Sequence, residues 1–188
     1  MNFDSYTDRS VAVAVDLANT FSPVSETEKL VTPADLAAFL LSHEMRPNRP
    51  PTERDVAEVR SIRERLRQAF QAEDEKRATA VLNSLLRDVD AHPHLSGHDG
   101  EPFHIHYAPT EAPIARHVAA TGAMGLAVVI AEGGYDRLGV CAWERCQDVF
   151  VDASRNRSRR YCDPAVCGNR ASVAAHRRRQ KESAAAQA

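Results

Sequence analysis

The chain has 188 residues, of which 43% are hydrophobic and 27% charged, and its formal net charge is −2. This composition excludes a disordered chain and fits one mid-sized soluble domain beside a small one. The longest uninterrupted apolar run, 123–131, is far shorter than the roughly 20 residues of a spanning helix, and no secretory leader is visible. We therefore expect a cytoplasmic protein without a membrane partner.

The charge is distributed unevenly along the chain. From Cys141 onward there are ten basic and five acidic residues, a net charge of +5, whereas residues 1–140 carry 14 basic and 21 acidic residues, a net charge of −7. A basic segment beside an acidic body indicates that the segment alone meets a polyanion. A solvated charged surface is the alternative interpretation.

Residues 1–140 are predicted to be mainly helical. The alternating Val and Ala of Val11–Thr20 favour a strand, although the alanines leave a helix open. Cap signals then predict helices from Thr32 to about Ser42, from Thr52 to about Phe70 and from Asp74 to about Val89, and a further helix starts at Glu111-Ala-Pro113 and runs to about Ala131. The prolines between 46 and 51 separate the first two of these, and the short link 71–73 predicts an antiparallel helical hairpin.

Residues 92–107 are rich in histidine. The histidines of this segment are His92, His94, His98, His104 and His106. Histidines two apart on a strand share a face, so a second metal site is conceivable, but no carboxylate pattern supports it. We interpret the segment as a loop that ends in a short strand, Phe103–Tyr107, and expect a further strand over 135–140.

All four cysteines lie in the last third of the chain. They form two C-x4-C pairs, Cys141 with Cys146 and Cys162 with Cys167, with fifteen residues between the pairs. Paired cysteines at hairpin distance are typical of a four-thiolate zinc site, and a reducing cytosol favours a metal over two disulfides or free thiols. Four thiolates close the coordination shell and leave no water to activate, and no nucleophile–base pattern occurs elsewhere. We therefore expect a protein that is not an enzyme.

Local signals explain how the cysteines meet. Asp163 followed by Pro164 predicts a helix start, which makes Cys162 and Cys167 the N′ and N4 residues, whose side chains touch across the first turn. The first pair flanks a compact turn that carries Trp143. Between the pairs, a strand over 148–152, a turn over 154–158 and a return strand over 159–161 predict a β-hairpin. The result is a treble-clef-like module.

Several motifs resemble the bacterial CGNR zinc-finger family. They are Phe150-Val-Asp152-x-Ser154, Arg159-Arg160-Tyr161-Cys162 and Cys167-Gly168-Asn169-Arg170. In that family an ABATE domain with an Asp-x-x-Asn-Thr motif usually precedes the finger, and this chain has Asp16, Asn19 and Thr20. The resemblance implies a stress-induced, DNA-binding transcriptional regulator. Tyr161 stands where the family commonly has Trp and Ser172 where it commonly has Lys, which removes one phosphate contact.

The predicted fold is mainly α. We expect a helical ABATE-like domain over 1–139, a C-terminal zinc module of β-hairpin plus helix over 140–182, and a frayed tail over 183–188. The four cysteines would hold one structural Zn²⁺ per chain. Asp16, Asn19 and Thr20 would either bind a ligand or brace the following element.

The predicted partner is double-stranded DNA. The contacting residues would come from the helix and hairpin of the module: Arg155, Arg157, Arg159, Arg160, Arg170, Arg177, Arg178, Arg179 and Lys181. Arg170 has an alternative role, in which it holds Asp152 of the hairpin. The helical domain would sense a signal or form a homodimer. A zinc-stabilised module for protein–protein interaction without nucleic-acid binding is the alternative function.

Overall fold

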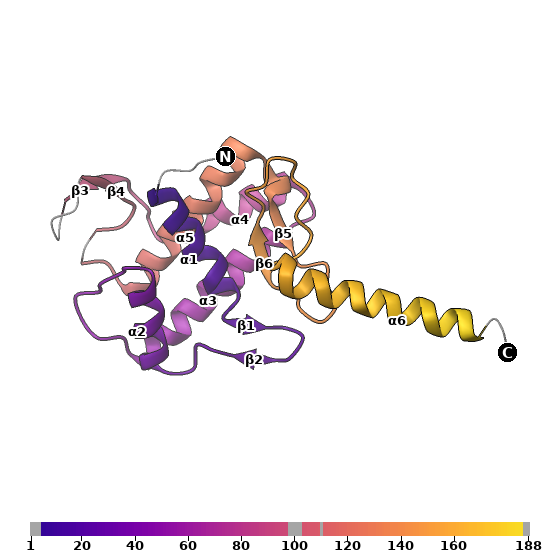
Figure 1. Cartoon of the computed structure of the whole chain (residues 1–188). Helices are drawn as coiled ribbons and strands as arrows, with labels where there is room; N and C mark the ends of the chain where they lie inside the picture. The colour runs from indigo at the N-terminus through magenta and orange to yellow at the C-terminus, as the bar shows by residue number, and fades with distance from the viewer. Residues whose placement is uncertain (1–4, 98–102, 110, 186–188) are drawn as a thin grey trace.

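The computed structural model describes residues 5–97, 103–109 and 111–185, and it shows a helical body from which one long helix projects (Figure 1). The α-helices are α1 Ser5–Ala18, α2 Pro33–Ser42, α3 Glu53–Phe70, α4 Glu75–Asp88, α5 Ile114–Gly133 and α6 Asn169–Ala185. The shorter helical turns are η1 Tyr135–Arg137, of the 3-10 type, and η2 Pro164–Gly168, of the π type. We call α1 to α5 the helical body.

The strands form three short antiparallel pairs. They are β1 Phe21–Ser22 with β2 Thr27–Glu28, β3 His94–Ser96 with β4 His104–His106, and β5 Leu138–Val140 with β6 Val149–Val151. With helices forming the body and a small cysteine-rich module at the C-terminal side, the predicted mainly α fold is confirmed.

The predicted helix starts at Thr32, Thr52 and Asp74 are confirmed, and each cap side chain accepts a hydrogen bond from the backbone N–H three residues later. In the capping box at Thr52, the buried carboxylate of Asp55 also accepts hydrogen bonds from Nη1 and Nη2 of Arg49, at 2.7 and 2.8 Å. That guanidinium, with the Thr52 hydroxyl and N–H, holds the pKa of Asp55 far below its usual range although burial opposes the shift. The capping box therefore also anchors the proline-rich segment before α3.

The strand favoured for Val11–Thr20 is wrong, because the segment forms most of helix α1. Alternating Val and Ala fits either structure, and packing decides between them. Val13, Ala14, Leu17 and Ala18 recur with helical spacing and are buried in the core.

Helix α5 lies at the centre of the body and packs against α1, α3 and α4. By length and composition alone, its 20 residues could cross a membrane, which the shorter apolar run 123–131 does not indicate. In this structure the helix instead supplies much of the buried core. Gly125 brings α5 very close to α1, since a Cβ at this position would lie 2.6 Å from the carbonyl carbon of Ser10 and 2.7 Å from the backbone nitrogen of Val11. Gly125 thus allows the close packing of α5 against α1.

The histidine-rich segment forms the β3–β4 hairpin, at the end of the body opposite α6 (Figure 1). The predicted strand over 103–107 is confirmed as β4, whereas its partner β3 was not foreseen. The rings of His94 and His106 face each other across the hairpin with centroids 5.8 Å apart. His98 lies outside the described residues. Among the residues that the structure describes, only the cysteines form a group of three or more potential metal ligands.

The β5–β6 hairpin joins the helical body to the C-terminal module. Leu138 and Val149 belong to the same buried core as α1, α3 and α5. The predicted boundary between residues 139 and 140 falls inside β5, and the division into two domains stays a prediction. Helix α6 continues to Ala185, so the first three residues of the expected tail are helical.

We expect Gly125→Ala to lower the free energy of unfolding by about 1 kcal/mol. The new methyl group meets backbone atoms of α1 that cannot move aside without separating the helices, a cost of about 1–3 kcal/mol that exceeds the gain of about 1 kcal/mol in helix propensity. Gly122→Ala is the matched control, because its Cβ would meet the flexible side chain of Leu66 at 3.2 Å. Urea unfolding followed by circular dichroism measures both, and equal stabilities would contradict the close approach.

Candidate metal centre

The four cysteine side chains converge on one point. Their Sγ atoms all lie within 4.8 Å of one another, and Cys162 is 3.5 Å from both Cys146 and Cys167. All four are free thiols, buried or half-buried. Four metal–sulfur bonds of about 2.3 Å in a tetrahedron place the sulfurs about 3.8 Å apart, so the cluster fits a tetrahedral thiolate site of the kind that zinc fingers contain.

The first pair of thiols lies in the loop of the β5–β6 hairpin. The N–H of Cys141 donates to the carbonyl of Asp148 at 2.8 Å, and the N–H of Cys146 donates to the carbonyl of Trp143 at 2.9 Å. These bonds close the compact turn that the sequence predicts around Trp143. Gln147 then takes a left-handed conformation, with φ 61°, and leads the chain back into β6.

The second pair lies at the start of the C-terminal helix. Oδ1 of Asp163 accepts from the N–H groups of Ala165 and Val166 at 2.8 and 3.0 Å, which confirms the predicted cap. The N–H of Cys167 donates to the carbonyl of Asp163, so the sulfurs of Cys162 and Cys167 meet across the first turn as expected. The turn is of the π type and continues directly into α6. The position of α6 therefore follows from this pair.

The electrostatics of the cluster call for a cation. Burial raises the pKa of Cys146 to about 12 and also raises that of Cys162. Burial acts on Cys141 too, but backbone hydrogen bonds from Cys162 and Trp143 outweigh it and lower the pKa of this thiol. Four thiolates this close are stable only around a metal ion that neutralises them. A tetrahedral metal ion bound by all four sulfurs would have no open coordination position, which is the arrangement of structural sites.

The hairpin predicted between 148–152 and 159–161 is wrong in its second strand. β6 pairs with β5, which precedes the first cysteine, and residues 159–161 form no strand. They run beside the hairpin instead: the N–H of Arg159 donates to Oδ2 of Asp152, and the carbonyl of Arg160 accepts from the N–H of Ala142.

Some of the predicted DNA-contacting arginines are used inside the module. The guanidinium of Arg159 donates to the carbonyls of Val151, Tyr161 and Cys162 and lies 4.9 Å from the centre of the Phe150 ring. Arg157 forms an ion pair with Asp136 at 2.8 Å. Arg155 and Arg160 are exposed, and Arg160 lies 6.0 Å from the Tyr161 ring centre.

Arg170 lies over Trp143, with its guanidinium carbon 5.3 Å from the ring centre. The contact links α6 to the first cysteine turn as a cation–π interaction. Asp152, the expected partner of Arg170, instead accepts from the N–H groups of Ser154 and Arg159 at 2.8 Å each. Arg170 thus has the expected structural role, but its partner is Trp143 and not Asp152.

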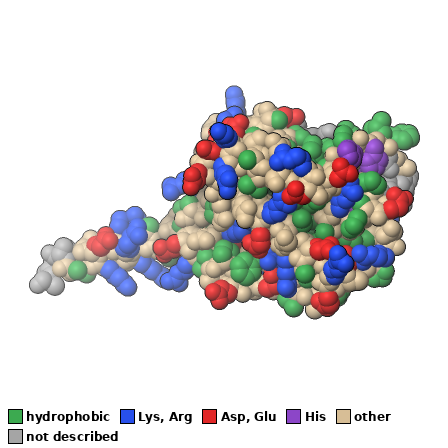
Figure 2. Space-filling view, turned by 180° about the vertical axis from the view of Figure 1, so that it is seen from behind, with side chains coloured by type: hydrophobic (Ala, Val, Ile, Leu, Met, Phe, Trp, Pro, Cys, Tyr) green, Lys and Arg blue, Asp and Glu red, His purple; other side chains and the backbone are tan. Residues whose placement is uncertain are grey.

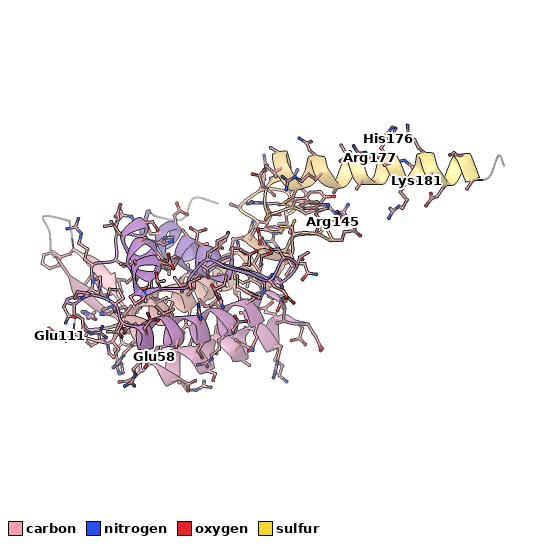
Figure 3. All side chains as sticks on the ribbon, turned by 90° about the horizontal axis from the view of Figure 1, so that it is seen from below. Glu58, Glu111, Arg145, His176, Arg177 and Lys181 are labelled. Atoms are coloured by element: carbon pink, nitrogen blue, oxygen red, sulfur yellow. The ribbon has the colours of Figure 1, made fainter. Side chains whose placement is uncertain are left out.

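The remaining predicted basic residues lie on α6. Arg177, Arg178, Arg179 and Lys181 are all exposed, and none of the α6 side chains that the structure describes is buried. Figure 3 shows Arg177 and Lys181 on the part of the helix that extends beyond the body, with Arg145 near its base. In the space-filling view, Lys and Arg side chains gather along this helix (Figure 2).

The Asp-x-x-Asn-Thr motif lies at the end of α1, next to the C-terminal module. The side chain of Asn19 accepts from the N–H of Val149 at 2.8 Å and donates to its carbonyl at 2.9 Å. Thr20 donates to the carbonyl of Leu17 and accepts from Arg63. Asp16 is more exposed, with a carboxylate oxygen 3.5 Å from Nε2 of His43. Asn19 and Thr20 thus form the contacts of a brace.

Sequence reasoning missed one residue at this junction. Arg67 of α3 is only 5% exposed and donates to the carbonyls of Ala18 and Gln147. Arg67 follows Arg63 by one helical turn, on the edge of the apolar stripe of α3, and that placement was the available signal.

Two family models match the chain in the order that the motifs indicate. A model described as "ABATE, putative stress-induced transcription regulator" matches residues 12–133, and the CGNR zinc finger matches residues 137–180. The chain belongs to the ABATE family and ends in a CGNR zinc finger. The first match covers the helical body from residue 12 onward, and the second match includes all four thiols. No curated protein matches the chain. Both families are of regulator or zinc-finger type, and neither is a family of enzymes.

We expect the purified protein to hold one metal ion per chain, and we expect Cys162→Ser to lose it. Serine does not supply an anionic ligand at neutral pH, and Cys162 touches two of the other sulfurs. Elemental analysis after dialysis against a mild chelator measures the content. Ser172→Ala on α6 is the control, since Ser172 is exposed and its hydroxyl donates to the carbonyl of Gly168. Equal metal content in both variants would contradict the ligand assignment.

Proposed function

We propose that this protein is a DNA-binding transcriptional regulator in which one structural Zn²⁺ fixes α6 as the DNA-contacting helix. Zinc is the metal of choice for a closed set of four thiolates. The observation that carries the proposal is α6 itself: it projects from the body, buries no described side chain and carries most of its exposed charge as Arg and Lys.

The basic residues of α6 do not all share a face. At 100° per residue, Arg177 and Lys181 fall on the same side of the helix as Arg170, with Arg178 beside them, whereas Arg179 falls on the opposite side. A helix lying on DNA presents one side to the phosphates. The side that begins at Arg170, next to the metal centre, is the one we assign to DNA.

The charge of the rest of the molecule supports this orientation. Residues 1–140 carry a net charge of −7, so the body repels a polyanion while the +5 of the C-terminal segment attracts it. A single finger gives a small interface, so tight sequence-specific binding would use two copies on two half-sites. The body is then the part that senses a signal or forms the dimer.

We expect the protein to bind duplex DNA with a logarithmic salt slope of about −4 to −5, which corresponds to four to six neutralised phosphates. Replacing Arg177, Arg178 and Lys181 with alanine should weaken binding to every sequence and flatten the slope by about 2–3. The measurement is a titration of labelled duplex at several salt concentrations.

The matched control removes three exposed cations from α4 of the body. Lys76, Arg77 and Arg87 replaced with alanine give the same change in net charge, and binding should stay within about twofold of wild type at moderate salt. If the two triple variants bind alike, or if wild type shows no binding even at low salt, the DNA assignment fails and a protein-docking module becomes the better interpretation.

Single substitutions test the face of the helix. We expect Arg177→Ala to weaken DNA binding about five- to tenfold near 0.1 M salt, the effect of one lost phosphate contact, and Arg179→Ala to weaken it clearly less. Both residues are exposed and two positions apart, so net charge and helix stability change equally. Equal effects on the same titration would show that α6 is held by diffuse charge, with no preferred face.

A further inference from the structure

The carboxamide of Asn19 completes the open edge of strand β6. Val149 pairs with Val140 in the hairpin, and on its other side its N–H and C=O both bond the Asn19 side chain, at 2.8 and 2.9 Å. Val149 is completely buried, so these two backbone groups need partners within the protein. One side chain at the end of α1 thus replaces the peptide group of a neighbouring strand.

Arg67 fixes the residue that follows Cys146. Gln147 has φ 61°, a left-handed conformation that is unfavourable for residues other than glycine, and its carbonyl accepts from the buried guanidinium of Arg67. The same guanidinium donates to the carbonyl of Ala18, the residue before Asn19, at 3.1 Å. Arg67 therefore ties α3, the end of α1 and the first cysteine turn together.

The two contacts act on one short segment. Asn19 holds Val149 and Arg67 holds Gln147, and between them the carbonyl of Asp148 accepts from the N–H of Cys141 at 2.8 Å. Both residues are supplied by the helical body, yet the backbone that they hold begins directly after Cys146 and accepts a hydrogen bond from the backbone N–H of Cys141. The geometry of the first C-x4-C pair is therefore set from outside the module.

We propose that Asn19 and Arg67 are positioning residues of the metal centre, through which metal binding and the conformation of the helical body are coupled. The inference rests on the proposed zinc binding and is independent of DNA binding. Coupling of this kind is reciprocal: a change in the body that moves the end of α1 lowers the metal affinity, and metal loss loosens the end of α1. The motif at residues 16–20 is then a link between the two parts of the protein.

The test measures the Zn²⁺ affinity of the full chain by competition with a chromophoric chelator. Asn19→Asp keeps an acceptor for Val149 but has no donor for its carbonyl, and Arg67→Lys reaches one carbonyl where the guanidinium reaches two. We expect each to lower zinc affinity about ten- to a hundredfold, as loss of a partner that orients a metal ligand does. Arg65→Lys is the matched control, since Arg65 is a half-buried arginine of the same helix α3 but bonds Ser84 and Asp88 of α4.

A rescue variant separates positioning from general stability. Gln147→Gly makes the left-handed conformation free of strain, so in this background Arg67→Lys should cost much less zinc affinity than in wild type. Hydrogen exchange gives the reciprocal readout: removing zinc from the wild type should raise exchange at residues 17–20.

Two results would overturn the inference in distinguishable ways. If Asn19→Asp and Arg67→Lys lower the melting temperature as Arg65→Lys does but leave zinc affinity unchanged, the residues merely stabilise the body. If the wild-type chain takes up no zinc, the proposed metal site fails and the coupling with it. Should either variant fail to fold, the exchange experiment on the wild type decides, and protection at 17–20 that is equal with and without zinc refutes the coupling.

Discussion

Val149 is completely buried in the core of the helical body, yet it lies only three residues after a thiol of the metal cluster. The β5–β6 hairpin thus belongs both to the core of the body and to the metal centre, and the rest of the structure depends on this constraint. The C-terminal module is too small to build a core of its own. It is held from one side by the apolar face of the hairpin and from the other by four converging sulfurs, and the direction of α6 follows from both.

The molecule uses a different source of order in each part. The body is ordered by apolar packing close enough to need Gly125, and the module by thiols, caps and the backbone contacts of Arg159. Helix α6 buries no described side chain, and its base is fixed by the Asp163 cap, by Cys167 and by the contact of Arg170 with Trp143. The body therefore fixes the position of the hairpin, the hairpin that of the metal centre, and the metal centre that of α6.

Local signals in the sequence were sufficient for some of this and insufficient for the rest. Caps at Thr32, Thr52 and Asp163 depend on neighbouring residues only, so they could be predicted, as could the meeting of Cys162 with Cys167. The strand over 148–152 was also visible, but its partner was assigned to 159–161, because alternation does not specify which segment completes a pair. For Val11–Thr20, the Ala–Val alternation fits a strand or a helix, and only the packing of α1 against α5, close at Gly125, decides between them. Buried arginines such as Arg67 contradict the usual inside–outside rule, and only their position on α3 pointed to them.

The exposure of α6 has an evolutionary consequence. Because its side chains contribute almost nothing to the core, substitutions along the outer turns carry little cost in folding, and those turns can change while the scaffold stays fixed. The residues that cannot vary in this way lie at the start of the helix, where Gly168 packs against the ring of Tyr161 and Arg170 forms its cation–π contact with Trp143. One fold can in this way present different surfaces through changes that are confined to the outer turns of a single helix.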